Sequence, residues 1–393
     1  MRILFVAMTD SPHAAGWLNL LKDTGWDIYL FSAYITTRTQ HYWKLSPTTC
    51  LLPSRSADGV KLVSLFPQRH ASSALEWSLN RAAGGPGWRS RWLAWAIKRL
   101  KPDIVHSLEM QKAGVLTLRA RERCCGAFPT WAISNYGSDV YLFGRLASTR
   151  PDVLAMLRSA DQYMAECERD LALARELGFK GEMLPVVPNC GGFDLPHLKS
   201  LMQPGPTSAR RVIAIKGYQN WAGRALTALK AVELCADALE GYKICFYLAN
   251  DDLRIAAELL ALETGLDIQC LPGGLPHDEI LHLHGRSRVS VGISISDAAS
   301  TSMLESMAMG SFPIQTCTAC ADEWIEDGKS GFIVPPDDPN LIAERLRQAI
   351  VDDALVDRAS ELNANTAKER LDRVKISLSV QKAYESILMQ QKT

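Results

Sequence analysis

Two carboxylates, Asp297 and Glu305, have seven residues between them, among which is a turn of small residues. Asp297 ends an apolar run with β-branched residues, and Glu305 lies in an amphipathic segment that closes on Gly310. Strand, small turn, helix and glycine stop form one α/β unit. In parallel sheets, ligands bind beyond the carboxyl ends of the strands, and N–H groups at a helix start suit anions. A ligand is therefore expected to face Asp297 and the backbone N–H groups of Ala298, Ala299, Ser300, Thr301 and Ser302.

Both carboxylates also have an ordinary structural explanation. Residues 302–305 read Ser-Met-Leu-Glu, which fits a capping box with Glu305 returning to the N–H of the cap. A carboxylate at the end of a buried strand is costly without partners. For Asp297 the candidate partners are a sugar hydroxyl, an acceptor or Lys216.

The elements that position these residues alternate strand and helix along the whole chain. At 393 residues the chain is too long for one ordinary core, and residues 199–210 form a linker rich in Pro, Gly and Ser. We therefore predict an N-terminal domain over 1–200 and a C-terminal domain over 211–375. A helix with apolar spacing follows at 376–393.

The segment around the carboxylates resembles a known family. Asp297, seven residues and Glu305 are followed by Ser-Met-Ala-Met-Gly-Ser-Phe-Pro at 306–313. Residues 322–328 and 331–338 resemble the E-I-x-x-G and G-x-L-V-x-P-x-D tail of the same family. It is the group 1, or family 4, type of retaining glycosyltransferase that uses nucleotide sugars. The departure is Asp297, where the family usually has Glu.

The resemblance implies an α/β fold of two Rossmann-like domains facing a central cleft, the GT-B architecture. It implies transfer of a sugar, with retention, from a nucleotide-diphosphate sugar to a hydroxyl of a glycan, a lipid-linked glycan or a small molecule. Glu305 would bind the ribose and Asp297 would position the transferred sugar. The last helix would pack back on the first domain. We expect no metal and no cofactor beyond the donor substrate, because cationic side chains and the helix start take up the charge.

Further donor-binding residues follow from the same resemblance. Lys216 and Arg224 stand in the loop where the family places an Arg and a Lys on the pyrophosphate, with the types exchanged and the spacing longer. The alternative for both is ordinary surface charge. Leu271 and Ile280 flank a segment that resembles the loop against the nucleobase.

The N-terminal domain would supply the acceptor side. His13 lies in the first loop, and His106 ends a strand in Pro-Asp-Ile-Val-His. Residues 137–139 correspond to the family's Gly-x-Asp, with Tyr136 where many members have His. We assign His13 and Asp139 to catalysis, and His106, Gly137 and Ser138 to the acceptor. A surface helix cap for His13, a structural role for His106 and an N-cap for Asp139 are the alternatives.

Composition excludes several classes of protein. Lys and Arg number 43, as do Asp and Glu, so no net field favours nucleic acid. No apolar run approaches the roughly 20 residues that cross a bilayer, and the N-terminus does not resemble a signal peptide. We therefore expect a cytoplasmic location. A lone Cys-x-x-Cys at 317–320 lacks the second ligand pair of a zinc site.

The segment 88–101 is basic and rich in tryptophan. Basic amphipathic helices with Trp favour the membrane interface, which suggests peripheral contact at the inner face of a membrane. Alternatively, Trp92 and Trp95 pack into the core beneath a solvated basic face.

Two other functions fit the same sequence. One is an epimerase or phosphorylase of the same fold. The other is a catalytically silent partner that binds a sugar nucleotide within a glycan assembly complex. Three departures from the family favour this alternative: Asp in place of Glu at 297, the missing Gly-Gly of the first loop and the missing His of the cleft.

Overall fold

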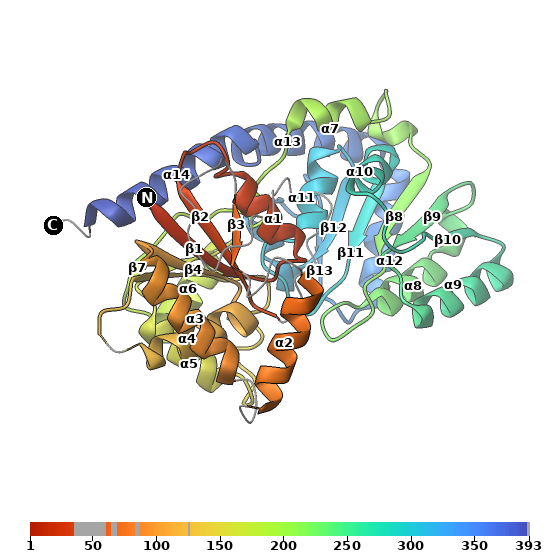
Figure 1. The fold of residues 1–393 in the computed structure, drawn as a ribbon. Helices are drawn as coiled ribbons and strands as arrows, with labels where there is room; N and C mark the ends of the chain where they lie inside the picture. Colours follow the sequence, from red (N-terminus) through yellow and green to blue (C-terminus); the bar gives the residue numbers. More distant parts are fainter. Residues whose placement is uncertain (35–59, 64–68, 83–86, 125, 391–393) are drawn as a thin grey trace. The chain divides into compact units, whose positions relative to one another are not determined.

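A computed structural model describes residues 1–34, 60–63, 69–82, 87–124 and 126–390. Its contacts divide the chain into an N-terminal unit, Met1–Gly191 with Val374 onward, and a C-terminal unit, Gly192–Arg373. The division falls before the linker at 199–210, because α7 (Leu195–Leu201) packs on α10 (His277–Arg286). Both units contain parallel sheets flanked by helices (Figure 1).

The N-terminal unit has a parallel sheet of seven strands in the order β3-β2-β1-β4-β5-β6-β7. Its strands are β1 (Arg2–Ala7), β2 (Asp27–Ser32), β3 (Lys61–Val63), β4 (Ile104–Leu108), β5 (Thr130–Ser134), β6 (Gln162–Met164) and β7 (Glu182–Met183). Its helices are α1 (Pro12–Asn19), α2 (Arg69–Ala82), α3 (Gly87–Leu100), α4 (Val115–Arg123), α5 (Arg150–Ser159), α6 (Glu168–Glu176) and α14 (Arg373–Gln390), with one π-helical turn, η1, at Met110–Gly114.

Strand β1 contributes to two cores because its side chains alternate across the sheet. Leu4 and Val6 pack in the cluster that contains Trp92 of α3, whereas Ile3 and Phe5 pack in the cluster of α1 and α14. Strand β1 therefore needs a continuous apolar sequence, because both faces of a parallel sheet are covered by helices.

The last helix, α14, completes the N-terminal unit (Figure 1). Ile376, Val380 and Tyr384 are buried in the same cluster as β1 and α1. The Oη of Tyr384 accepts a hydrogen bond from Nε1 of Trp17 at 2.9 Å. A segment from the end of the chain thus packs on elements from its beginning.

The C-terminal unit repeats the plan with six parallel strands in the order β10-β9-β8-β11-β12-β13. The strands are β8 (Val212–Lys216), β9 (Lys243–Tyr247), β10 (Asp267–Cys270), β11 (Val289–Gly292), β12 (Phe312–Thr316) and β13 (Phe332–Val334). Besides α7 and α10, its helices are α8 (Ala225–Leu234), α9 (Asp251–Thr264), α11 (Thr301–Ala308), α12 (Pro339–Val351) and α13 (Asp353–Arg370). This is the doubly wound strand order of dinucleotide-binding folds.

Helices α8, α9, α12 and α13 enclose the main core of the C-terminal unit on one face of its sheet. A smaller cluster on the other face includes Tyr247 of β9 and Leu283 of α10. None of the helices within the described ranges is both long and apolar enough to cross a membrane.

Candidate functional site

The candidate donor site lies at the carboxyl ends of β8 and β11 in the C-terminal unit. These neighbouring strands form the point at which the strand order reverses, where ligands bind in open parallel sheets. Lys216 is the last residue of β8, and the chain leaving β11 runs through Asp297 to α11. The structure therefore brings Lys216 and the 297–305 segment to one edge of one sheet.

The turn before α11 is longer than the sequence predicts. Strand β11 ends at Gly292, and not at Asp297, because the chain beyond it pairs with the loop before α8: Ile295 N donates to Ala222 O at 2.9 Å. Asp297 is half-buried, and its Oδ1 accepts from Ala298 N at 3.0 Å. Its backbone N donates to Thr318 O at 3.2 Å.

Backbone amides at the start of α11 are left for a ligand. Ala298, Ala299 and Ser300 are buried, and Ser300 is the N-cap of the helix. The N–H groups of residues 299–301 donate to no acceptor within the described part of the chain. Orphan amides at a helix start favour a phosphate or another anion.

Glu305 is buried in α11 and does not cap it. The capping-box alternative is wrong, because Ser300 is the cap and Ser302 already lies inside the helix. Instead, Glu305 Oε1 lies 2.6 Å from Nε2 of His277, at the start of α10. Burial alone would raise the pKa of Glu305, but the hydrogen bond from His277 and the charges of His277 and Lys216 outweigh it, so the pKa lies below its usual value.

A second histidine lies behind this carboxylate. His284 is fully buried, its Nδ1 is 2.9 Å from Ser290 Oγ, and its Nε2 is 4.0 Å from Glu305 Oε2. Burial lowers the pKa of His284 to about 4, so the ring is neutral at pH 7. The ring of Tyr247 packs edge-on against it.

Neither His277 nor His284 was predicted from the sequence. Pro276-His277-Asp278 reads as an ordinary helix start, and only the packing of α10 beside α11 brings these histidines to Glu305. Leu271 and Ile280, predicted to lie against the nucleobase, both pack on the apolar cluster that contains Tyr247. Their ligand contacts stay a prediction.

The two predicted pyrophosphate cations differ in their surroundings. Nζ of Lys216 lies 4.9 Å from the ring centroid of Tyr218, and Lys216 forms no ion pair with any residue that the structure describes. Arg224 folds onto its own loop, where Nη1 donates to the carbonyls of Asn220 and Gly223 at 3.1 and 2.9 Å. Lys216 is therefore the more available cation of the two.

Asp139, the predicted catalytic residue of the N-terminal unit, lies in the segment that follows β5. Oδ2 of Asp139 is buried and accepts from Met110 N at 2.8 Å and Tyr136 N at 2.9 Å. The N-cap alternative is wrong, because no helix starts there. Burial, and next the charge of Glu109, raise the pKa of Asp139 well above its usual value. Catalysis by Asp139 stays a prediction.

Glu109 is a second buried carboxylate that the sequence did not reveal. It follows β4 with a φ of 81°, and its carboxylate accepts from Lys112 N and Ala113 N in η1. Burial raises its pKa to about 7, against the effect of these amides. The unusual backbone that aims this side chain inward has no marker in the sequence.

His13, Gly137 and Ser138 keep positions near this edge of the N-terminal sheet. His13 lies in the first turn of α1, and its ring centroid is 5.9 Å from that of Tyr136. Ser11 is the N-cap of α1, so His13 is not the capping residue. Gly137 has a φ of 46° and donates its N–H to Glu166, while Ser138 is buried.

The predicted role of His106 in acceptor binding needs correction. Its ring is fully buried, with Nδ1 2.6 Å from Tyr384 Oη and Nε2 2.8 Å from Ser134 Oγ. Burial lowers its pKa to about 3. Both nitrogens are engaged inside the core of the N-terminal unit, so the structural alternative holds and acceptor binding does not.

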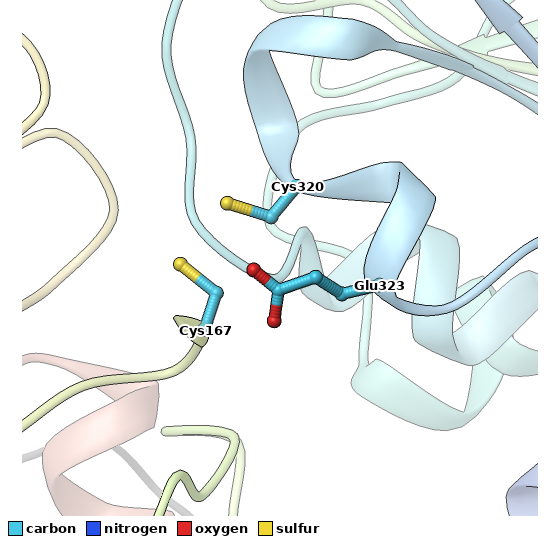
Figure 2. Close-up of side chains that lie close together, drawn as sticks. All are labelled: Cys167, Cys320 and Glu323. Atoms are coloured by element: carbon cyan, nitrogen blue, oxygen red, sulfur yellow. The ribbon is translucent and has the colours of Figure 1, made fainter. Parts of the chain in front are cut away.

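The Cys-x-x-Cys motif lies on short 3-10 turns of the C-terminal unit. Cys317 is exposed and Cys320 is buried. Figure 2 shows the side chains of Cys320 and Glu323 projecting to the same side of this segment; Cys167, drawn with them, belongs to the N-terminal unit. Two ligand types on one turn do not make a zinc site, and independence from metal stays a prediction.

Comparison with known proteins supports this description. Residues 227–369 match the family model of glycosyl transferases group 1. No curated protein sequence matches the chain. Among solved structures, sucrose-phosphate synthase from Thermosynechococcus elongatus aligns with 99% of this chain and 100% of its own, at 13% identity and a TM-score of 0.73. Anabaena HepE in complex with UDP-glucose aligns with 98% of this chain and 100% of its own, at 14% identity and a TM-score of 0.69.

A third similar structure is a UDP-forming α,α-trehalose-phosphate synthase from Burkholderia xenovorans in complex with glucose-6-phosphate. It aligns with 98% of this chain and 100% of its own, at 12% identity and a TM-score of 0.68. These likenesses extend over both units, and the family model covers most of the C-terminal unit, including Glu305. The chain thus has the GT-B fold of these glycosyltransferase structures, and residues 227–369 of its C-terminal unit match the model of glycosyl transferases group 1.

Proposed function

We propose that the protein is a retaining hexosyltransferase of the family 4 type, which moves a sugar from a nucleotide-diphosphate sugar to an acceptor hydroxyl. The observation that carries this proposal is the buried carboxylate of Glu305 in α11, beside the unbonded amides of residues 299–301. A ribose hydroxyl would donate to Glu305, and the amides with Lys216 would hold the diphosphate. Related folds crystallised with UDP-glucose support this class of donor.

The chemistry requires charge stabilisation on the departing diphosphate. Lys216 and the α11 amides supply it without a metal ion, an electrostatic role for preorganised donors. Asp297 would position the transferred sugar. The carboxyl edge of the N-terminal sheet, with His13, Gly137, Ser138 and Asp139, would bind a glycan or lipid-linked acceptor, in cytoplasmic polysaccharide synthesis.

The test is thermal unfolding with UDP, GDP, ADP, dTDP and CMP, each alone and as a sugar conjugate. A ligand at 100 times its Kd adds about 2.7 kcal/mol to the free energy of unfolding, so one nucleotide class is expected to raise the midpoint clearly. Release of that nucleotide when acceptors are added then reports transfer. A folded protein that responds to none of them contradicts the proposal.

A silent sugar-nucleotide-binding partner is the second candidate. The observation in its favour is Arg224, whose guanidinium is bonded to its own loop. Such a protein would show the raised midpoint but no transfer to any acceptor.

Contact with a membrane through α3 is a further part of the proposal. Arg89 and Trp92 are buried, so the packing alternative is right for Trp92. Trp95, however, is 47% exposed. The exposed face of α3 consists of Arg91, Trp95, Lys98 and Arg99. A tryptophan among three cations suits anionic headgroups.

We expect the protein to sediment with vesicles containing about one third anionic lipid and not with neutral vesicles. Replacing Lys98 and Arg99 together with Glu is expected to weaken this binding about tenfold or more, because each basic residue near an anionic surface contributes about 1 kcal/mol. Lys180→Glu, an exposed cation elsewhere in the unit, is the control. Equal binding by the double variant and the control contradicts membrane contact through α3.

A further inference from the structure

His277 contacts Glu305, the carboxylate that is proposed to bind the ribose of the donor. Nε2 of His277 is 2.6 Å from Oε1 of Glu305, and this is the only hydrogen bond that Glu305 makes through its side chain within the described ranges. The Glu305 side chain is 6% exposed, whereas that of His277 is 57% exposed. A buried carboxylate is thus joined to solvent through one histidine.

Glu305 Oε2 is left without such a partner. Nε2 of His284 lies 4.0 Å from it, beyond hydrogen-bond distance. A carboxylate with one oxygen fixed and the other open is suited to accept from a hydroxyl. Fixing Oε1 also selects the orientation in which Oε2 is presented.

The charges around His277 determine when it can serve this role. Glu305 of α11 and Asp278 of its own helix favour the imidazolium, while Arg373 opposes it. Lys216 and His284 act on the same carboxylate from β8 and α10. When His277 is protonated, its positive charge next to Glu305 offsets a negative charge that would otherwise face an anionic ligand.

We propose that His277 is a positioning residue for the donor: it holds Oε1 of Glu305, leaves Oε2 for a ribose hydroxyl, and neutralises that carboxylate beside the diphosphate. The inference rests on the proposed function, since it concerns the same nucleotide-sugar site. It makes donor binding depend on a proton carried by His277.

The sign of this dependence follows from the structure. The hydrogen bond to Glu305 raises the pKa of His277 above its usual 6.5, although burial opposes it. Below the raised pKa the imidazolium is present and the donor binds well. As the pH rises through it, the charge is lost and the Kd increases. By linkage, donor binding near this pH takes up protons.

The experiment measures the Kd of nucleotide sugars by calorimetry at pH 6.0 and pH 8.5. UDP-glucose, GDP-mannose, ADP-glucose and dTDP-glucose are used, because their diphosphate diesters do not titrate in this range. For the tightest of the four, we expect the wild-type Kd to rise about threefold to tenfold between the two pH values. His277→Gln should bind weakly at both, and His277→Lys tightly at both, since lysine stays charged.

The matched control is His197→Gln. His197 also pairs with a carboxylate of the same unit, Asp278, at 3.1 Å, but this pair does not include Glu305, so the wild-type pH dependence should remain. A His277→Gln variant that keeps the full wild-type pH dependence overturns the role of His277 while leaving the proposed function intact. Failure of all four sugars to bind wild-type protein at either pH overturns both.

Discussion

Glu305→Gln is expected to weaken binding of the nucleotide sugar about 10- to 100-fold while the protein stays folded. The substitution keeps the shape of the side chain but removes the charge, and hydrogen bonds to a charged group are worth about 1.5–3 kcal/mol. It also places a neutral amide next to His277, so the imidazolium loses the partner that stabilises it. Titration calorimetry with the nucleotide sugar that raises the unfolding midpoint measures the loss.

Glu326→Gln is the control for this experiment. Glu326 pairs with Lys329 on the surface of the same unit, and both side chains are 65% exposed. This variant should bind as the wild type does. If Glu305→Gln binds with unchanged affinity and an unchanged unfolding midpoint, then Glu305 does not contact the ribose.

Lys216→Ala is expected to lower kcat about 100- to 1,000-fold, with a smaller effect on the Kd of the donor. Charge on the diphosphate grows as the sugar departs, so a preorganised cation stabilises the transition state more than the ground state. Lys216 suits this role because it is the last residue of β8, where the strand order reverses, and because it forms no ion pair among the residues described. Initial rates at saturating donor measure the change.

Two other cations test whether the effect is specific. Lys230 pairs with Glu233 on the exposed face of α8, so Lys230→Ala should leave kcat unchanged. Arg224→Ala should lower kcat less than Lys216→Ala and more than Lys230→Ala, because the Arg224 guanidinium already donates to its own loop. Equal rates for Lys216→Ala and Lys230→Ala would show that Lys216 does not act on the leaving group.

The sequence predicted those parts of the fold that depend on local pattern. The run of β1, the turn before α11 and the glycine stop at Gly310, which has a φ of 72°, all appear in the structure. The GT-B fold, suggested by one segment of about forty residues, is confirmed by the match to solved structures over both units.

What the sequence could not supply depends on tertiary packing. His106 ends a strand just as a ligand-binding residue would, and only the pairing with Ser134 and Tyr384 shows that its ring is turned into the core. His277 and Glu305 are 28 residues apart, and no local pattern indicates that the two side chains meet. Glu109 depends on a backbone conformation that propensities disfavour.

The position of α14 has a consequence for synthesis of the chain on the ribosome. The core of the N-terminal unit includes Ile376, Val380 and Tyr384, which are translated after the entire C-terminal unit. Until α14 is made, the part of this apolar face that α14 covers stays exposed beside α1, and exposed apolar surface favours aggregation and binding by chaperones. A premature stop codon at position 374 would spare every donor-site residue and yet remove part of the core of the first-made half of the protein.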